Sequence, residues 1–472
     1  MGPLHGVDAQ IEGDVAIATD AAHLLSRYGA SVRVSVSGDS SSGVQVAVSG
    51  SGCLPASARL SGAVAPCPGL PAAVPARAAA GLLVLGALAA ARVGARVVVD
   101  ANAPAILLLQ PLVLAHWYSA PQPVRTTPLR VGEGWVAAEL GAPGDADLFR
   151  LLREMDSFTD AEELSAAAQQ WRLPVVPYRR AHAARRGSPH RASHHEQNGS
   201  GGARPSQAPP AATHPLAGVK VVDVTAMWAG PLCTWLLAQL GASVVTVESG
   251  ARPDGMRAPL GGGIYPAGIL VSGARDRSAM FASLAAGKER VDLDLRAKND
   301  REAFTLACAQ ADLRVDNLSR RARENLGIND QSEFGHAPAV VHLPAFSSGR
   351  SRDWVAYGTQ VHAMSGLAWP AGSDEPIPAA TAYVDALGGI AGALASVVAL
   401  YSGAQQQVTP IMTASLMDAV DSIPADRDGG ALLLADPMPR VAELAEAHAV
   451  RAVELSVGGV SLRHPASPFV SA

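Results

Sequence analysis

The sequence predicts an α/β protein with a parallel sheet, a small α+β domain and an internal duplication. Three observations support this. Residues 219–224 and 243–248 are apolar, strand-like runs on either side of a helix-like segment, the pattern of a βαβ unit. Residues 129–180 mix short strands with amphipathic helices. The start of the chain also repeats, at constant spacing, the segment that begins at residue 215.

Composition limits the class of protein. A chain of 472 residues, 48% of them hydrophobic, can bury a large core, and its length suggests about three domains. A net charge of −5 gives no reason to expect nucleic acid as a partner. The four cysteines have no zinc-site spacing, so we expect reduced thiols, no bound metal and a cytoplasmic protein. We expect no signal peptide, because no basic segment followed by an apolar one opens the sequence. We expect no membrane span, because the longest apolar runs (78–91 and 386–401) are too short.

Residues 1–128 form the first expected unit. Leu24, Leu25 and Tyr28 share one face of a helix-like segment, and Gly29 stops it. Residues rich in Gly, Ser, Pro and Ala at 38–75 predict a loop. The expected elements are helices at 14–28, 76–91 and 105–117 and strands at 31–36 and 96–100.

Residues 129–180 form the small α+β domain. Gly132 and Gly134 lie at the turn of an expected hairpin, and a loose capping box at Thr159 opens a helix. The expected elements are the hairpin 129–140, helices at 145–155 and 159–171, and a strand at 173–178. Residues 181–214 then predict a flexible linker, in which a solvated His194-His195 pair is more probable than a metal site.

Residues 215–425 form the second large unit, and residues 426–472 form a C-terminal closing segment. Beyond the βαβ unit we expect strands at 290–295, 313–317 and 339–344 and helices at 300–311, 386–401 and 414–420. The first turn reads Thr225-Ala-Met-Trp-Ala-Gly-Pro231, which lacks the phosphate-binding glycines of Gly-x-Gly-x-x-Gly. A dinucleotide cofactor is therefore not expected.

Asp385 is the main candidate for chemistry. The sixteen residues that follow it, 386–401, carry no charge, and a helix that is apolar on every side belongs in a core. Asp385 stands where the N-cap would stand, and the free N–H groups and the helix dipole there favour an ionised carboxylate. The residue is either an ordinary N-cap or a carboxylate nucleophile at the floor of a cleft.

The two halves share a register. At an offset of 212, Gly6-Val7, Leu24-Leu25 and Gly29-Ala-Ser-Val32 match Gly218-Val219, Leu236-Leu237 and Gly241-Ala-Ser-Val244. A weaker match aligns the apolar helix 76–91 with the Asp385 helix and places Ala76 opposite Asp385. We interpret this as a duplication in which the first copy has lost the carboxylate.

The second half resembles the family III CoA-transferases, the group of formyl-CoA transferase, the carnitine CoA-transferases and α-methylacyl-CoA racemase. The resemblance rests on an ordered series of motifs over roughly two hundred residues rather than on any single one. These motifs are Pro215-Leu-x-Gly218-Val, Val222-Asp-Val-Thr, Ala229-Gly-Pro231, Leu240-Gly-Ala-x-Val244-x-x-Val247-Glu248, Gly287-Lys288, Val291-Asp-Leu-Asp-Leu295, Ala311-Asp312-x-x-Val315-x-Asn317, Leu326-Gly327, Asp385 and Ser415-Leu-Met-Asp418-Ala.

The resemblance implies a large domain with a Rossmann-like open parallel sheet and two chains that interlock like links. Residues 1–128 resemble half of that domain in degenerate form, residues 129–180 its small domain, and residues 426–472 its closing segment. The second copy has no small domain of its own between about 421 and 432. We therefore expect either a pseudo-dimer within one chain or a homodimer, and residues 129–180 should then pack near Asp385.

The resemblance also implies a reaction. Asp385 would attack the thioester of an acyl-CoA, form an aspartyl-CoA thioester and pass CoA to a carboxylic acid, with one active site per chain and no permanently bound cofactor. Residues that would contact CoA or shape the pocket are Met227, Trp228, Leu293, Leu295, Arg296, Asn317, Leu318, Tyr357, Tyr383 and Gly388. Ser249 and Asn325 stand where the family often has arginine, which would leave Arg252 or Arg257 and Arg321 or Arg323 to serve.

Two other readings stay open. Tyr357 takes the place of the histidine of the racemase branch, and His362 lies five residues later, so racemisation is the weaker alternative. The third alternative is a non-catalytic CoA-binding or scaffold protein, because residues 129–180 contain no glycine-rich lid.

Overall fold

The computed structural model describes residues 2–36, 44–50, 53–118, 127–140, 144–155, 158–180, 195–197, 214–257, 278–328, 330, 337–370, 372–406, 409–421, 423, 435–449, 453–457 and 460–471. Every structural statement below concerns these residues. The expected α/β class with parallel sheets is confirmed.

The first half builds a sheet whose described strands run β18-β5-β4-β3-β1-β2. Strand β1 is parallel to β2 and antiparallel to β3, and the C-terminal β18 pairs with β5. The C-terminal segment therefore completes the sheet of the first half. The elements are β1 (Val7–Gly13), α1 (Val15–Arg27), β2 (Ser31–Val36), β3 (Gln45–Gly50), β4 (Cys53–Leu60), α2 (Val74–Ala90), β5 (Arg96–Val99), α3 (Ala103–Leu108), α4 (Gln110–Trp117) and β18 (Phe469–Ser471).

The expected loop over residues 38–75 was wrong in part, because β3 and β4 lie within it. Val46, Val48, Ala58 and Leu60 alternate with exposed residues and point into the core. The many small residues of this stretch made its alternation of buried and more exposed side chains, which is typical of strands, hard to see in the sequence.

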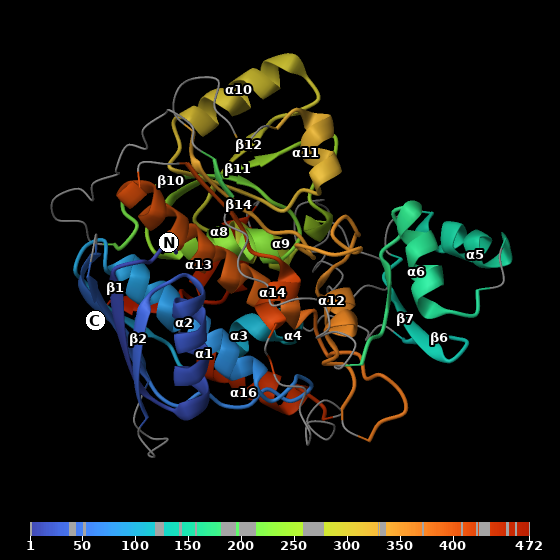
Figure 1. Cartoon of the computed structure of the whole chain (residues 1–472), viewed down its shortest axis with the longest axis horizontal. Helices are drawn as coiled ribbons and strands as arrows, with labels where there is room; N and C mark the ends of the chain where they lie inside the picture. The colour runs from blue at the N-terminus through green and yellow to red at the C-terminus, as the bar shows by residue number, and fades with distance from the viewer. Residues whose placement is uncertain are drawn as a thin grey trace.

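The small domain has its own three-stranded sheet, ordered β6-β7-β8, and its own apolar core. It stands at the right of Figure 1, beside α12. Its helix α6 begins one residue later than a cap at Thr159 would allow, because Asp160 is the N-cap. The elements are β6 (Leu129–Val131), β7 (Gly134–Ala138), α5 (Asp145–Met155), α6 (Ala161–Gln170) and β8 (Val175–Pro177).

The second half builds a larger sheet, ordered β12-β11-β10-β13-β14-β15-β9, in which only the β9 pairing is antiparallel. Of the expected linker, the described parts are β9, which pairs with β15, and His214, which lies close to Gly241; the rest, His194 included, lies outside the described residues. The strands are β9 (His195–Gln197), β10 (Lys220–Val224), β11 (Ser243–Glu248), β12 (Glu289–Asp292), β13 (Leu313–Asp316), β14 (Ala339–His342) and β15 (Thr409–Thr413).

Helices cover both faces of this second sheet, and the remaining elements follow it in the chain. They are α8 (Ala229–Gln239), η1 (Gly255–Arg257), α9 (Ala279–Ala285), α10 (Lys298–Ala309), α11 (Arg320–Leu326), α12 (Gly358–Ser365), α13 (Tyr383–Gln406), α14 (Leu416–Val420), α16 (Met438–Ala449) and the hairpin β16 (Val453–Val457) and β17 (Val460–His464).

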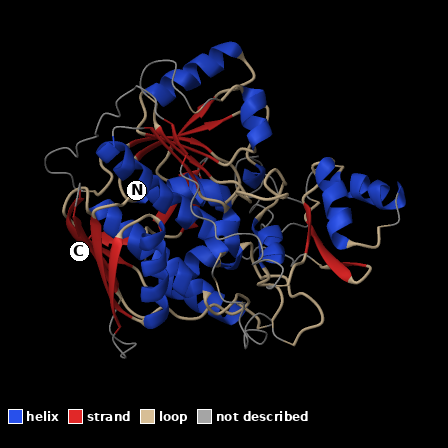
Figure 2. Cartoon of the chain, viewed as in Figure 1, coloured by secondary structure: helices blue, strands red, loops and turns tan. Residues whose placement is uncertain are grey.

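The two sheets sandwich two layers of helices. Helices α8 and α13 pack on the second sheet, α1 and α2 pack on the first, and α13 contacts α2 (Figure 1). Figure 2 shows the helices massed between the two groups of strands. One continuous apolar core runs through both halves. Among the described helices, α13 is long and apolar enough to cross a membrane, but 94% of that stretch is buried inside the protein.

The two βαβ units have the same register at the offset of 212. Asp8 pairs with Ser31 in the first sheet, and Lys220 pairs with Ser243 in the second. The turns repeat as well: the Leu4 N–H donates to the carbonyl of Tyr28 as the Leu216 N–H donates to that of Leu240. The sequence match therefore corresponds to matching hydrogen bonds.

Candidate functional site

Asp385 lies in the first turn of α13, and its carboxylate accepts the backbone N–H of Gly358. The Oδ2–N distance is 3.1 Å, and the residue is 5% exposed. Because α13 begins at Tyr383, the expected N-cap position was wrong: Asp385 is the third residue of the helix, and its own N–H donates to the Ala382 carbonyl. The helix starts two residues before Asp385, at Tyr383, and the uncharged run after Asp385 gave no sign of this earlier start.

Gly358 is required at this contact. A Cβ at this position would lie 2.7 Å from the Asp385 Oδ2 and 2.8 Å from the Asp385 backbone nitrogen. Gly358 is also the first residue of α12, so its N–H is one of the helix-terminal donors without an intrahelical acceptor. The Asp385 carboxylate thus lies at the N-terminal turns of two helices, where partial positive charge gathers.

Tyr357 precedes Gly358 as the N-cap residue of α12. Its backbone N–H donates to the side-chain oxygen of Gln360 at 2.8 Å. Burial raises the pKa of the Tyr357 phenol, and the negative charges of Glu139, Asp145 and Asp385 raise it further, while Arg252 opposes them. The phenol is therefore a neutral donor among carboxylates. Tyr357 thus lies next to the Gly358–Asp385 contact, and its expected role in substrate binding stays a prediction.

Glu139 reaches the same place from the small domain. It is 8% exposed, and its Oε2 accepts a hydrogen bond from Thr359 Oγ1 at 2.9 Å. Sequence reasoning missed this residue. No local motif marks it, since it simply follows β7, and its partner lies in the other half of the chain.

The small domain holds the segment that carries Tyr357 and Gly358. Gln169 exchanges two hydrogen bonds with the backbone of Val355, at 2.9 and 2.7 Å. The Arg179 N–H donates to the Ala363 carbonyl at the far end of α12. Residues 129–180 therefore pack beside the Asp385 contact, and the arrangement that would have refuted the pseudo-dimer is not observed.

The loop after β10 forms the other side of the region. The Asn317 side chain makes two hydrogen bonds with the Ala226 backbone, at 3.1 and 2.7 Å. Met227 has φ +69°, a left-handed conformation that side chains other than glycine rarely adopt. The loop leads into α8, whose Ala229 lies against the α13 turn that follows Asp385.

Several expected contact residues are used in packing. Trp228 is fully buried and Leu295 is 6% exposed. Leu293 and Leu318 pack, partly buried, against the cluster that contains Leu295. Arg296 is exposed and pairs with Asp294 at 2.7 Å. Core packing thus accounts for the tryptophan and the three leucines of the predicted set, but not for Met227.

Tyr383 and Gly388 also have structural roles. The Tyr383 hydroxyl donates to His362 Nδ1 at 2.9 Å, and His362 Nε2–H donates to the Ile377 carbonyl at 3.2 Å. Burial lowers the pKa of His362 to about 4, so its ring is neutral. Gly388 lets the Leu416 side chain reach α13, since a Cβ there would lie 2.1 Å from Leu416 Cδ2.

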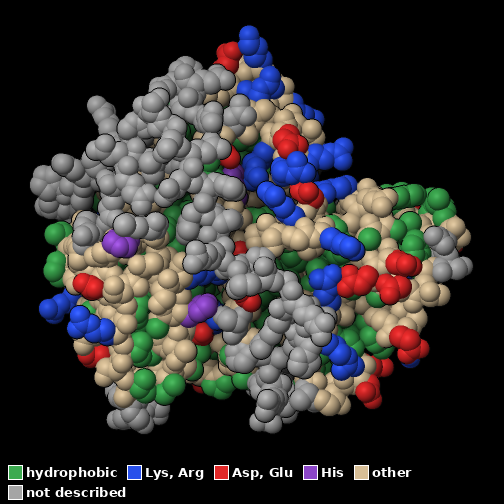
Figure 3. Space-filling view, viewed as in Figure 1, with side chains coloured by type: hydrophobic (Ala, Val, Ile, Leu, Met, Phe, Trp, Pro, Cys, Tyr) green, Lys and Arg blue, Asp and Glu red, His purple; other side chains and the backbone are tan. Residues whose placement is uncertain are grey.

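The basic side chains divide into buried or half-buried ones and exposed ones, and several of the exposed ones also form ion pairs. Arg257 is 7% exposed, binds Glu248 through two hydrogen bonds and lies over the Phe281 ring, and Arg323 pairs with Asp316. Exposed Lys and Arg side chains gather over α11 and toward the small domain on the face seen in Figure 3. Members of the exposed group are Arg252, Arg290, Arg296, Lys298, Arg320 and Arg321.

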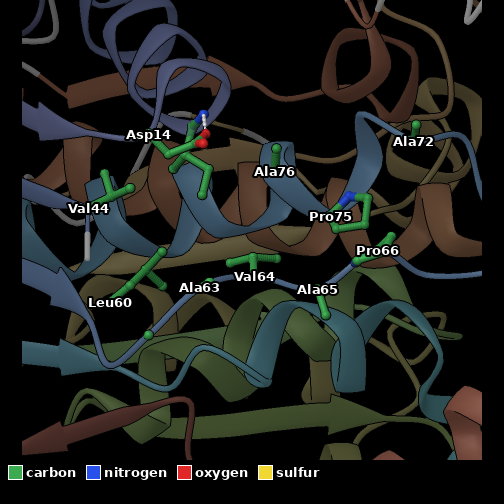
Figure 4. A pocket seen from close by; sticks show the side chains of 12 residues that line it. Asp14, Val44, Leu60, Ala63, Val64, Ala65, Pro66, Ala72, Pro75 and Ala76 are labelled. Carbon is green, nitrogen blue, oxygen red and sulfur yellow. Dashed lines mark hydrogen bonds between the residues drawn. The ribbon is translucent and has the colours of Figure 1, made fainter. Parts of the chain in front are cut away.

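A cavity of about 240 Å³ lies in the first half, where the repeat would place a counterpart of the Asp385 site (Figure 4). Ala76, the third residue of α2, lines it together with Pro75 and Asp14. The Asp14 carboxylate caps α1 by accepting the N–H groups of Ala16 and Ile17. The cavity thus offers no carboxylate at the position that corresponds to Asp385.

The described part of the chain offers no set of side chains that could bind a metal ion. No group of three or more His, Cys, Asp or Glu side chains there could hold an ion. Cys53, Cys67, Cys233 and Cys308 are free, and burial raises the pKa of each thiol.

Comparison with known proteins confirms the resemblance for the second half. Residues 216–433 match the family described as CoA-transferase family III. This stretch contains Asp385, Gly358 and the loop after β10, whereas Glu139 lies outside it.

Curated relatives carry related names. The chain is 30% identical over 208 residues to formyl-CoA:oxalate CoA-transferase of Rhodopseudomonas palustris, covering 42% of this chain and 47% of that protein. It is 28% identical over 182 residues to acetyl-CoA:oxalate CoA-transferase of Acetobacter aceti, covering 37% and 44%. It is 33% identical over 126 residues to succinyl-CoA:mesaconate CoA-transferase of Haloarcula hispanica, covering 26% and 30%. The chain spans less than half the length of these relatives.

Solved structures are more distant. A hypothetical protein of Mycobacterium tuberculosis aligns with a TM-score of 0.38 at 22% identity, covering 44% of this chain and 56% of that one. A CAIB/BAIF family protein of Brucella suis aligns with a TM-score of 0.36 at 24% identity, covering 44% and 55%.

Proposed function

We propose that this chain, whose residues 216–433 match CoA-transferase family III, transfers CoA from a donor acyl-CoA to a carboxylic acid, with Asp385 as the nucleophile. One observation carries the proposal: a shielded carboxylate held at two helix N-termini, within the matched segment. The names of the relatives support the reaction class.

The reaction would proceed by two exchanges at the Asp385 carboxyl. The carboxylate attacks the thioester carbonyl and the C–S bond breaks, giving a mixed anhydride and CoA thiolate. The thiolate attacks the aspartyl carbonyl, displaces the donor acid as its carboxylate and leaves an aspartyl-CoA thioester. The acceptor carboxylate reverses both steps and departs as the new acyl-CoA.

The surroundings of Asp385 suit these steps. The Gly358 N–H holds Oδ2 and thereby orients the carboxylate. The neutral Tyr357 phenol could donate to the oxygen that becomes negative in the attack. Burial at 5% exposure slows hydrolysis of the anhydride and the thioester.

We further infer that the two halves form a pseudo-dimer with one active site. The matched registers of β1–β2 and β10–β11 support an internal duplication, and Ala76 stands where the first copy would need its carboxylate. The small domain of the first half would then complete the site of the second half through Glu139. We also infer a cytoplasmic enzyme.

His362 gives no support to the alternative, racemisation through proton exchange at the α-carbon. Its ring is 1% exposed, its two nitrogens bond Tyr383 and Ile377, and its lowered pKa keeps it neutral. A base for that reaction would have to accept a proton from substrate near neutral pH.

Intact-protein mass spectrometry tests the proposal. Wild type is incubated with a panel of acyl-CoAs, with and without hydroxylamine. We expect an adduct with the mass of CoA less water, which hydroxylamine converts to a hydroxamate, and loss of both in Asp385→Asn. Asp418→Asn is the matched control, because Asp418 is also a buried carboxylate in the first turn of a helix. An adduct that persists in Asp385→Asn would refute the assignment. CoA binding without any adduct would favour the non-catalytic alternative.

A further inference from the structure

The loop after β10 has a strained backbone at Met227, which contacts with neighbouring residues must stabilise. Met227 keeps φ +69° without being glycine. Such conformations persist where surrounding contacts over-determine them, and they concentrate at functional sites. The carboxyl ends of parallel strands are also where open α/β sheets bind ligands, and this loop follows β10 there.

Asp254 holds the backbone of Met227, as Asn317 holds that of Ala226. Its two carboxylate oxygens accept the Met227 N–H at 3.0 and 3.2 Å, and one of them also accepts the Met256 N–H at 2.9 Å. Asp254 is 9% exposed. Gly255 makes room for the Met227 side chain, because a Cβ there would lie 2.7 Å from its sulfur. The contact therefore involves both the backbone and the side chain of Met227.

Asp254 is itself held in place. Its backbone N–H donates to Glu248 Oε1 at 2.8 Å. Glu248 binds Arg257 through two hydrogen bonds of 2.6 and 2.7 Å, and the Arg257 guanidinium lies 3.8 Å from the centroid of the Phe281 ring. These contacts join the end of β11 and α9 to the loop after β10.

We propose that Asp254 is a positioning residue that fixes the loop 225–228 in the shape that receives the CoA thioester. The thioester part of this proposal rests on the proposed function. The loop runs into Ala229, whose carbonyl oxygen would lie 2.8 Å from a Cβ at Gly389, one turn beyond Asp385. Its shape therefore sets the position of a ligand bound to it relative to the Asp385 carboxylate.

A pH effect should follow from this arrangement. Burial, with a smaller effect from Glu248, raises the pKa of Asp254 to about 6 against the opposing effects of the Met256 and Met227 N–H groups and Arg257. Lys288 also faces Asp254. Above pH 6 the carboxylate is ionised and makes charge-assisted bonds. Below pH 6 it is protonated, so the hold on the loop and the affinity for the ligand should weaken.

Hydrogen exchange without ligand tests the positioning step. The wild-type chain is compared with Asp254→Asn and Asp254→Ala. The control is Asp160→Asn, since Asp160 also accepts two backbone N–H groups, in the small domain. We expect faster exchange of the peptide 225–232 in Asp254→Ala, unchanged exchange of the peptide 7–13, and no effect of the control on either. Unchanged exchange at 225–232 in Asp254→Ala would overturn the proposal.

Calorimetric binding of free CoA at pH 5.5 and 7.5 tests the ligand step. We expect about tenfold weaker binding by Asp254→Ala at pH 7.5 and a smaller loss in Asp254→Asn, with the pH dependence removed in both. Where turnover is measured, KM should rise more than kcat falls. Equal affinity and equal pH dependence in all variants would overturn the inference.

If wild type itself does not bind CoA, the proposed function fails, and the exchange experiment still decides the positioning role. If both variants fail to fold, hydrogen exchange of the wild type at pH 5.5 and 7.5 tests the positioning role instead. The peptide 7–13 then serves as the reference that corrects for the intrinsic pH dependence of exchange.

Discussion

Single residues at the candidate site act through partners that lie far away in the chain. Asp385 meets Gly358 in the preceding helix, and that helix meets Glu139 in the small domain. The Thr359–Glu139 hydrogen bond fixes the first turn of α12, which aims the Gly358 N–H at the Asp385 carboxylate. Removing one partner of such a buried hydrogen bond leaves the other without its bond, which lowers the stability of the folded protein.

Replacing Glu139 should separate its hydrogen bond from its charge. Glu139→Ala removes the 2.9 Å bond and leaves the Thr359 hydroxyl only its longer, 3.2 Å contact with the Gln360 side-chain oxygen, so we expect kcat to fall about tenfold. Glu139→Gln keeps an oxygen for Thr359 and should retain most of the activity. Steady-state kinetics of CoA transfer provide the measurement, and Glu163→Ala, at an exposed carboxylate of the same domain, is the control. Equal losses in the Gln and Ala variants would show that the charge matters rather than the hydrogen bond.

From the sequence, Asp385 and Tyr357 could be proposed as site residues, but Glu139 could not. An acidic residue before a long uncharged run stands out locally, and so does Tyr357 once the motif order is known. Glu139 does not, because its role comes from a contact between the two halves. Trp228 and Leu295 show the converse: position in a motif suggested ligand contacts, and burial places them in the core.

Among the elements, α13 connects most of the molecule. It packs against α8, α2, α14 and the strands β14 and β15, and it contributes Asp385. Glycines on its surface let neighbours approach closely: Gly388 faces Leu416, and Gly389 faces Ala229 and Leu232. The sequence predicted that this helix is buried, from its uncharged composition, but not which glycine faces which neighbour.

Replacing Gly389 or Gly388 by alanine should change the unfolding free energy by different amounts. At Gly389 the new Cβ would lie 2.8 Å from the Ala229 carbonyl oxygen, which is backbone, and we expect a loss of about 1–3 kcal/mol in unfolding free energy. At Gly388 it would meet the tip of Leu416, which can rotate away, and the gain in helix propensity of about 0.5–1 kcal/mol offsets much of the cost. Urea unfolding of Gly389→Ala and Gly388→Ala measures both, and the reverse order of stability would contradict the packing described.

For the whole molecule, the contact between α2 and α13 joins the halves at corresponding positions. The match that places Ala76 opposite Asp385 also places Gly81 opposite Ile390, and these two residues touch: a Cβ at Gly81 would lie 2.5 Å from Ile390 Cγ2. Contact between corresponding positions is the mark of a two-fold interface. The sequence match predicts a repeat, and the packing brings matched positions of the two halves into contact.

A double-mutant cycle tests whether this contact couples the halves. Gly81→Ala should destabilise the protein by about 1–3 kcal/mol through overpacking, and Ile390→Ala by about 2–5 kcal/mol through the cavity it leaves. In the double variant the new methyl group enters that cavity, so the loss should be smaller than the sum by about 1–3 kcal/mol. Gly86→Ala is the control on the same helix, because a Cβ there makes ordinary contacts of 3.4–3.5 Å with Ala58, Phe469 and Val97. It should be tolerated and should add to Ile390→Ala. Additive losses for Gly81→Ala and Ile390→Ala would mean that the halves do not meet at this point, and the pseudo-dimer would lose its central contact.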